Sequence, residues 1–137
     1  MFSFVRPEDG EAEHERLLEI EESILQALEI PSRVVNIAVD DLGGSAAQKS
    51  DCEARLPGQG RSRELTSTSN TTDFQSRRLD IRHRPGGGKP EQVHTLNGTA
   101  VAVGRTLIAL METHQTDDGG VLVPDVVREW GAAARLG

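Results

Sequence analysis

Between Arg33 and Val101 the chain contains several strand-like segments separated only by short turns. The stretch RVVNIAV (Arg33–Val39) is rich in β-branched residues and lies between Pro31 and the turn residues DDLGG, which predicts a buried strand. CEARL and RELTSTS predict two further strands on either side of a PGQG turn. Parallel neighbours need a long crossover, whereas antiparallel neighbours need only a turn. The sequence therefore predicts an α+β fold with an antiparallel β-sheet flanked by helices.

Two segments have apolar residues at helical spacing. The first, from about Glu8 to Glu29, has glutamates on its other faces, acidic residues at its start and Pro31 just beyond its end. Its predicted buried face consists of Leu17, Ile20, Ile24, Leu25 and Leu28. The second has Arg105 in its first turn and places Val103, Leu107, Ile108 and Met111 on one face. Each predicts a helix that packs on the sheet.

Shorter patterns complete the predicted fold. FSFV (Phe2–Val5) and the region around VHTLNGTAV predict strands, and Pro124 precedes a possible short helix. Ser45 is a candidate N-cap of a short helix through AAQKS. TTDFQSRRLDIRHR is compatible with either a turn of helix or a strand. The length of 137 residues fits one domain over 1–137.

Charge and cysteine content limit the classes of function. The net charge of −7 disfavours a freestanding nucleic-acid binder, whose affinity would depend on clustered Lys and Arg. The single cysteine, Cys52, excludes an internal disulfide and suits a reducing compartment. No stretch has the roughly 20 apolar residues that cross a bilayer, and the start does not resemble a signal peptide. We expect a cytoplasmic protein without a membrane partner.

Two common site patterns are not fulfilled. GGGKP (Gly86–Pro90) lacks the spacing of a phosphate-binding P-loop and is followed by a proline, so a hairpin loop is the better interpretation. The four histidines include no pair at i, i+4 and no neighbouring cysteine pair, which argues against zinc.

The remaining candidate site combines RELTSTSN with LNGTAVAVGRTLIALMETHQ. Glu64 and Ser67 offer the hard oxygen ligands that Mg²⁺ shares with phosphates. Gly98 permits close approach of the backbone. Arg105 is expected in the first turn of a helix, where free N–H groups and the helix dipole already favour an anion. The alternative from spacing alone is that Arg105 is an ordinary surface cation.

LNGTAVAVGRTLIALMETHQ resembles motif 3 of the class II aminoacyl-tRNA synthetases in the form found in seryl-tRNA synthetases. MFSFVRPED, RELTSTSN, DFQSRRLDIR and VHTLNGTAVAVGR are similar to segments that occur in the same order in that family. The resemblance runs from Met1 to about Val127 and implies the C-terminal half of a class II catalytic core, with motif 3 at about 93–115.

This resemblance implies activation of serine by ATP to seryl-adenylate and transfer of the seryl group to tRNA. It implies that Glu64 and Ser67 hold Mg²⁺ with ATP and that Leu65 and Thr66 line the nucleotide. Arg105 is the implied catalytic residue, which grips the γ-phosphate. Thr99 and Asn97 are the implied contacts to the substrate serine. The implied cofactors are therefore ATP and Mg²⁺.

Three segments of the resembled family have no counterpart between Met1 and Gly137. They are motif 1, which forms the family's homodimer interface, motif 2, and the arm that binds tRNA. We expect a ligase fragment that is incomplete as an isolated chain and that reaches tRNA only through those segments. The alternative is a non-catalytic relic or paralogue that binds a nucleotide or a protein partner.

Overall fold

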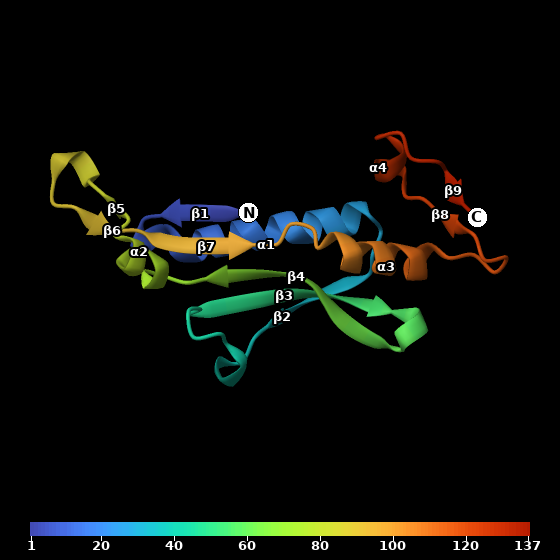
Figure 1. The fold of residues 1–137 in the computed structure, drawn as a ribbon, viewed down its shortest axis with the longest axis horizontal. Helices are drawn as coiled ribbons and strands as arrows, with labels where there is room; N and C mark the ends of the chain where they lie inside the picture. Colours follow the sequence, from blue (N-terminus) through green and yellow to red (C-terminus); the bar gives the residue numbers. More distant parts are fainter.

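A five-stranded antiparallel sheet with the strand order β1-β7-β4-β3-β2 forms the centre of the molecule (Figure 1). The computed structural model describes residues 1–137. The strands of this sheet are β1 (Phe2–Val5), β2 (Ser32–Asn36), β3 (Gln48–Leu56), β4 (Arg61–Asn70) and β7 (His94–Gly98). All four neighbouring pairs are antiparallel, so the predicted α+β class is confirmed.

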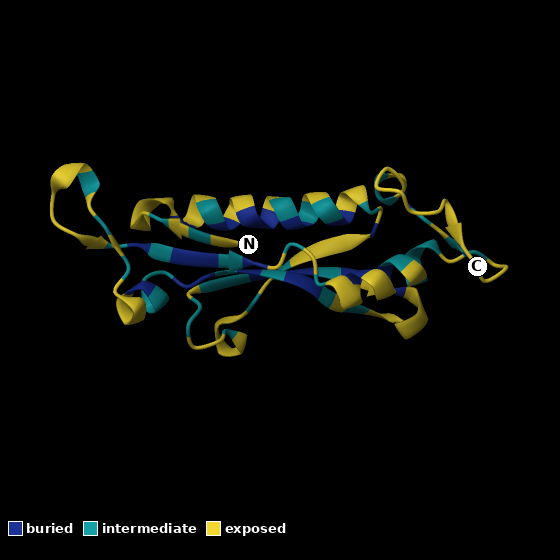
Figure 2. Cartoon of the chain, turned by 45° about the horizontal axis from the view of Figure 1, so that its top comes forward, coloured by how far each residue is buried: buried dark blue, intermediate teal, exposed yellow.

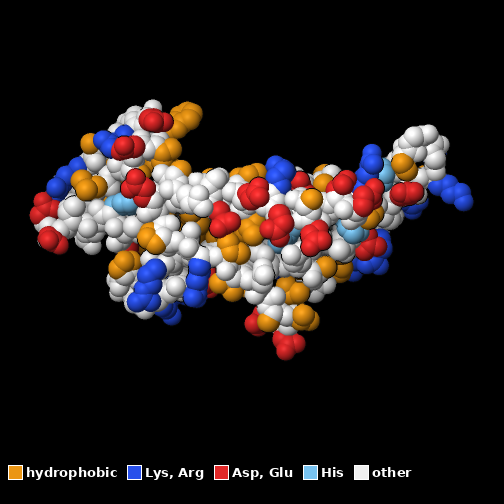
Figure 3. Space-filling model, turned by 180° about the vertical axis from the view of Figure 1, so that it is seen from behind, with side chains coloured by type: hydrophobic (Ala, Val, Ile, Leu, Met, Phe, Trp, Pro, Cys, Tyr) orange, Lys and Arg blue, Asp and Glu red, His pale blue; other side chains and the backbone are white.

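Helix α1 (Gly10–Ala27) covers one face of this sheet and turns its buried side toward the strands (Figure 2). Pro7 starts the 3-10 turn η1 (Pro7–Asp9) that leads into the helix, where its missing N–H costs nothing. Leu18 and Leu25 contribute to a core cluster with Ile30 and with residues of the strands and α3, namely Cys52, Ala54, Leu56, Leu65 and Ala109. Most glutamates of α1 lie on its outer side, where acidic side chains follow the helix (Figure 3), whereas Glu21 is fully buried against the sheet.

Helix α3 (Val103–His114) follows β7 directly and packs near β3 and the turn η3 (Pro57–Gln59). Smaller elements lie at the two ends of the molecule and in the loop that joins β2 to β3 (Figure 1). They are η2 (Val39–Asp41), α2 (Phe74–Leu79), β5 (Arg82–His83), η4 (Pro85–Gly87), β6 (Glu91–Gln92), β8 (Val121–Leu122), α4 (Asp125–Arg128) and β9 (Arg135–Leu136). No helix combines the length and the apolar character that crossing a bilayer requires.

Several local predictions are confirmed. GGGKP lies in the connection between β5 and β6, which pair as a hairpin. The ambiguous segment after Thr71 contains both a short helix, α2, and a strand, β5. A short helix also follows Pro124.

Three local predictions are wrong. β2 is a strand but is mostly exposed, because it lies at the edge of the sheet with β3 as its only neighbour. Residues 43–47 form turns that lead into β3, so Ser45 does not cap a helix. In α3 the buried residues are Thr106 and Ala109, and Leu110 is partly buried against the core cluster. The predicted apolar face is instead exposed, at 75% for Val103, 52% for Leu107, 48% for Ile108 and 48% for Met111.

Candidate nucleotide and magnesium site

A β-bulge between β3 and β4 brings Glu64 and Ser67 to the same face of the sheet. Asp51 pairs with Ser67 and Glu53 pairs with Glu64, and the register shifts between these two pairs. Asp51 and Glu53 are two residues apart and therefore share a face, and directly paired residues on neighbouring strands share a face as well. Glu64 and Ser67, three residues apart, would lie on opposite faces of a regular strand. Because of the bulge, Glu64 and Ser67 lie on the same face of the sheet, the one opposite α1.

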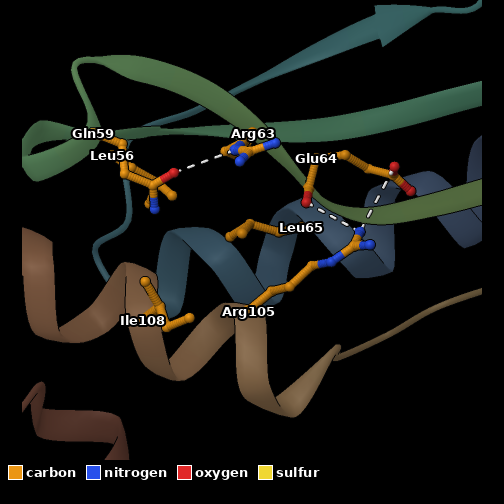
Figure 4. Close-up of a pocket in the computed structure, with 7 residues that line it drawn as sticks. All are labelled: Leu56, Gln59, Arg63, Glu64, Leu65, Arg105 and Ile108. Atoms are coloured by element: carbon orange, nitrogen blue, oxygen red, sulfur yellow. Dashed lines mark hydrogen bonds and ion pairs between the residues drawn. The ribbon is translucent and has the colours of Figure 1, made fainter.

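Arg105 reaches the same strand from the first turn of α3 (Figure 4). Its Nη1 donates a hydrogen bond of 3.2 Å to the backbone carbonyl of Glu64. The same nitrogen lies 3.6 Å from Oε2 of the Glu64 carboxylate. Both side chains keep access to solvent, with exposed fractions of 58% for Arg105 and 38% for Glu64. The structure thus brings together the acid and the guanidinium that the sequence placed 41 residues apart.

The predicted serine contacts lie beside Ser67. The backbone N–H of Thr99 donates a hydrogen bond of 3.0 Å to the carbonyl of Ser67 as the chain leaves β7. Asn97 pairs with Ser69 on β4, and Ser69 shares a face with Ser67. Asn97 therefore lies on the open face of the sheet, and Thr99 is exposed next to it.

Leu65 and Thr66 have different surroundings from Glu64 and Ser67. Thr66 pairs with Cys52 and is only 1% exposed, so its side chain faces the protein interior. Leu65 occupies the bulge, is 1% exposed, and belongs to the core cluster. It also contributes to the wall of the pocket beside Arg105. Any contact of Thr66 with a nucleotide must therefore come from its backbone.

A surface pocket of about 340 Å³ lies between β4, η3 and α3 (Figure 4). Arg63, Glu64 and Arg105 supply its charged groups. Its remaining lining comes from Leu56, Gln59, Leu65 and Ile108. Ligand pockets commonly combine apolar walls with a few convergent polar groups, and this pocket has that composition.

Two charged residues that the sequence did not single out complete the site. Lys49 and Asp51 lie two positions apart on β3, on the face that carries Ser67 and Glu64. The Lys49 ammonium lies 2.8 Å from Oδ1 of Asp51 and 4.0 Å from Oε1 of Glu64. The sequence signal is the Lys-x-Asp spacing on a strand, which places both charges on one face but does not reveal their neighbours.

The donor groups fit a magnesium ion that is shared with a phosphate ligand. No group of three or more His, Cys, Asp or Glu residues could enclose a metal by itself. The open face instead offers the Glu64 carboxylate and the Ser67 hydroxyl, both hard oxygen ligands. Mg²⁺ is usually held by one or two carboxylates together with phosphates and water, so this set matches its ordinary coordination in nucleotide sites.

Comparison with known proteins decides the family. The family model described as tRNA synthetase class II core domain (G, H, P, S and T) matches residues 1–114. The chain belongs to this class II tRNA synthetase core family. One curated relative is the serine–tRNA ligase of Rubrobacter xylanophilus, which is 57% identical over 127 residues, or 93% of this chain. Another is the serine–tRNA ligase of Streptomyces coelicolor, which is 58% identical over 130 residues, or 95% of this chain. The chain spans only 30% of the length of each of these two relatives.

Solved structures confirm this class II fold. A seryl-tRNA synthetase from Pyrococcus horikoshii, crystallised with ATP, superimposes with a TM-score of 0.95 at 46% identity. The match covers 98% of this chain and 30% of that one. The cytoplasmic serine–tRNA ligase of Naegleria fowleri, in complex with AMP, gives a TM-score of 0.90 at 38% identity, covering 98% of this chain and 32% of that one. The class II core in this chain thus corresponds to 30–32% of the length of these two synthetases.

Proposed function

We propose that this class II core segment contributes to a serine–tRNA ligase as the C-terminal half of its catalytic domain, with motif 3 at about 93–115. The observation that carries the proposal is the convergence of Glu64, Ser67 and Arg105 at one open site. The similarity to seryl-tRNA synthetases solved with ATP and with AMP supports a nucleotide as the ligand.

In the proposed reaction, a carboxylate oxygen of serine attacks the α-phosphorus of ATP and pyrophosphate leaves. The seryl group then passes to tRNA. This chemistry needs no enzyme nucleophile, because positioning and charge stabilisation supply the catalysis. Bound Mg²⁺ would neutralise charge on the phosphates, held by Glu64 and Ser67.

Arg105 is the proposed γ-phosphate ligand, because its planar and permanently charged guanidinium suits phosphate oxygens. In the structure the same group contacts Glu64. Binding of the triphosphate would exchange this ion pair for phosphate contacts and would leave the Glu64 carboxylate available to the metal. Both groups are partly exposed, so the exchange requires only side-chain rotation.

Thr99 and Asn97 are the proposed contacts to serine. A site that hydrogen-bonds the serine hydroxyl discriminates against alanine, because its polar groups would otherwise remain unpaired. The hydrogen bond from Thr99 N–H to Ser67 fixes this loop against the strand that carries the metal ligands. The backbone segments that position the amino acid and the nucleotide would therefore be hydrogen-bonded neighbours.

Serine-dependent exchange of labelled pyrophosphate into ATP tests the function. We expect exchange when the chain is combined with the N-terminal portion of a serine–tRNA ligase, and loss of most of it when Arg105 is replaced by alanine. Alanine in place of serine as substrate is the specificity control. Absence of exchange both with and without the N-terminal portion would remove the ligase proposal. Binding of MgATP without any exchange would instead favour a non-catalytic nucleotide-binding relative.

A further inference from the structure

Lys49 lies inside an acidic part of the open face. Its ammonium contacts Asp51 at 2.8 Å and approaches Glu64 at 4.0 Å, so one lysine lies between two carboxylates. The pairing partner of Asp51 on β4 is Ser67. The lysine charge therefore lies close to the residues proposed to hold magnesium.

The burial of Asp51 makes it energetically costly to move Lys49 away from it. The Asp51 side chain is only 10% exposed and that of Lys49 is 25% exposed. The ion pair with Lys49 is the only polar contact of the buried Oδ1 of Asp51. An uncompensated buried carboxylate is strongly unfavourable, so Asp51 holds the lysine in place. Glu64 is more exposed, at 38%, and has its second cation, Arg105, on its other oxygen at 3.6 Å.

We infer that Lys49 is the resident cation of the Asp51–Glu64 pair and competes with the divalent cation for Glu64. This inference rests on the magnesium site of the proposed function. When the metal enters, Glu64 turns from the ammonium to the metal, while Asp51 retains the lysine. Lys49 is then a positioning residue with two effects. Its positive charge lowers the affinity for the metal while no nucleotide is bound, and it balances the negative charges of Asp51 and Glu64.

The alternative assignment of Lys49 as a direct phosphate ligand fits these contacts less well. Its charge is already matched by Asp51 at ion-pair distance, and Glu64 adds further negative potential beside it. Arg105 has no comparable buried partner, because its only carboxylate contact is the half-exposed Glu64. The two cations therefore have different roles, with Arg105 available to phosphate and Lys49 retained by Asp51.

Binding of Mn²⁺, measured by the paramagnetic signal of the free ion, tests the inference on the full 137-residue chain without nucleotide or serine. Lys49→Met should tighten Mn²⁺ binding by about tenfold, because a like charge next to the metal ligand is removed. Lys49→Arg retains the charge and should stay within about twofold of the unaltered chain. Lys49→Met in a Glu64→Gln background should lose most of the gain.

A second pair of variants covers the possibility that Lys49→Met unfolds the chain by leaving Asp51 unpaired. Asp51→Asn and Asp51→Asn with Lys49→Met carry no buried charge at position 51 and differ only in the lysine. The double variant should bind Mn²⁺ several-fold more tightly than Asp51→Asn alone. Equal or weaker binding after removal of Lys49 in both backgrounds would overturn the inference, as would absence of Mn²⁺ binding in every variant. Pyrophosphate exchange reports on the ligase proposal independently, because the Mn²⁺ measurement uses neither ATP nor serine.

Discussion

At the scale of single residues, His14 shows how a buried group on α1 links stability to pH. Its side chain is 0% exposed, and its Nε2 lies 3.0 Å from the Ser50 hydroxyl. Ser50 donates its own hydrogen to Asn36 Oδ1 at 2.9 Å, so it can only accept from His14. The neutral ring therefore carries its proton on Nε2. Its Nδ1 is buried without a partner, so protonation there is unfavourable.

Burial accordingly lowers the pKa of His14 below its ordinary value of 6.5, and the nearby Glu15 charge only partly opposes this. The unfolded chain then binds more protons than the folded chain as the pH falls below 6.5, so the free energy of unfolding decreases in that range. Burial raises the pKa of Glu21, although its hydrogen bond with Thr68 opposes this shift. The raised pKa gives the opposite slope above the ordinary value of 4.5.

His14→Gln isolates the histidine contribution, because a glutamine can still donate to Ser50 but does not titrate. Urea denaturation from pH 7 to pH 5 should show that the unaltered chain loses more stability than the variant over this range. The Glu21 contribution is common to both proteins and cancels in the difference. Parallel pH profiles for the two proteins would show that His14 is not protonated preferentially in the unfolded state.

At the scale of elements, Gly98 determines how closely α1 approaches β7. A Cβ atom at this position would lie 2.8 Å from Glu21 Oε1, 2.9 Å from Thr68 Oγ1 and 3.1 Å from Met1 Cε. Glu21 and Thr68 are fully buried and hydrogen-bonded to each other at 2.6 Å, so neither can move away easily. The sequence placed Gly98 in the candidate site, whereas its close contacts in the structure are to Glu21, Thr68 and Met1, on the face of the sheet that α1 covers.

Gly98→Ala should therefore lower the free energy of unfolding by about 1–3 kcal/mol, through overpacking between α1 and the sheet. Gly104→Ala in α3 is the matched control, because a Cβ there meets nothing within 4 Å. It should be neutral or stabilising by about 0.5 kcal/mol, since alanine favours the helix. Denaturation with urea measures both changes. Equal midpoints for the two variants would contradict the packing described for Gly98.

The β3–β4 pair shows where prediction from sequence ends. The sequence pattern was sufficient to locate β4, the turn and the part of β3 from Cys52 to Leu56, but the first residues of β3 were predicted as a short helix. The bulge was not predictable, because it depends on which residues pair across the two strands. Without the bulge, Glu64 and Ser67 would be assigned to opposite faces, so their grouping came from the chemistry of their oxygen ligands and from the family resemblance, and not from periodicity. The ion pair of Lys49 with Asp51 was missed because Lys49 was assigned to a short helix, whereas β3 begins at Gln48.

Helix α3 and strand β2 show a related limit. Apolar periodicity correctly predicted that residues 103–114 form a helix, but it cannot specify which surface the apolar side meets. The small Ala109 allows α3 to approach the core, where Leu110 also packs, while the predicted apolar face remains exposed. In β2, β-branched residues predicted the strand itself, but its edge position in the sheet determined its exposure.

At the scale of the whole molecule, the residues that stabilise the fold and the residues of the proposed site lie on opposite faces of the sheet. The face under α1 contains the core cluster and the buried contacts of His14 and Glu21. The opposite face carries the polar residues of the proposed site, with Arg105 reaching it from α3. Substitutions of the partly exposed Glu64 and Arg105 should consequently change ligand binding more than folding.

Calorimetric titration of MgATP into the unaltered chain and into Arg105→Ala tests the central claim most directly. Arg16→Ala is the matched control, because Arg16 is also an exposed arginine in an ion pair, with Glu13 on α1. We predict binding by the unaltered chain, unchanged binding by Arg16→Ala, and at least about tenfold weaker binding by Arg105→Ala, as expected for loss of a charged phosphate contact. Binding that survives Arg105→Ala unchanged would show that the nucleotide does not occupy the site formed by Glu64, Ser67 and Arg105.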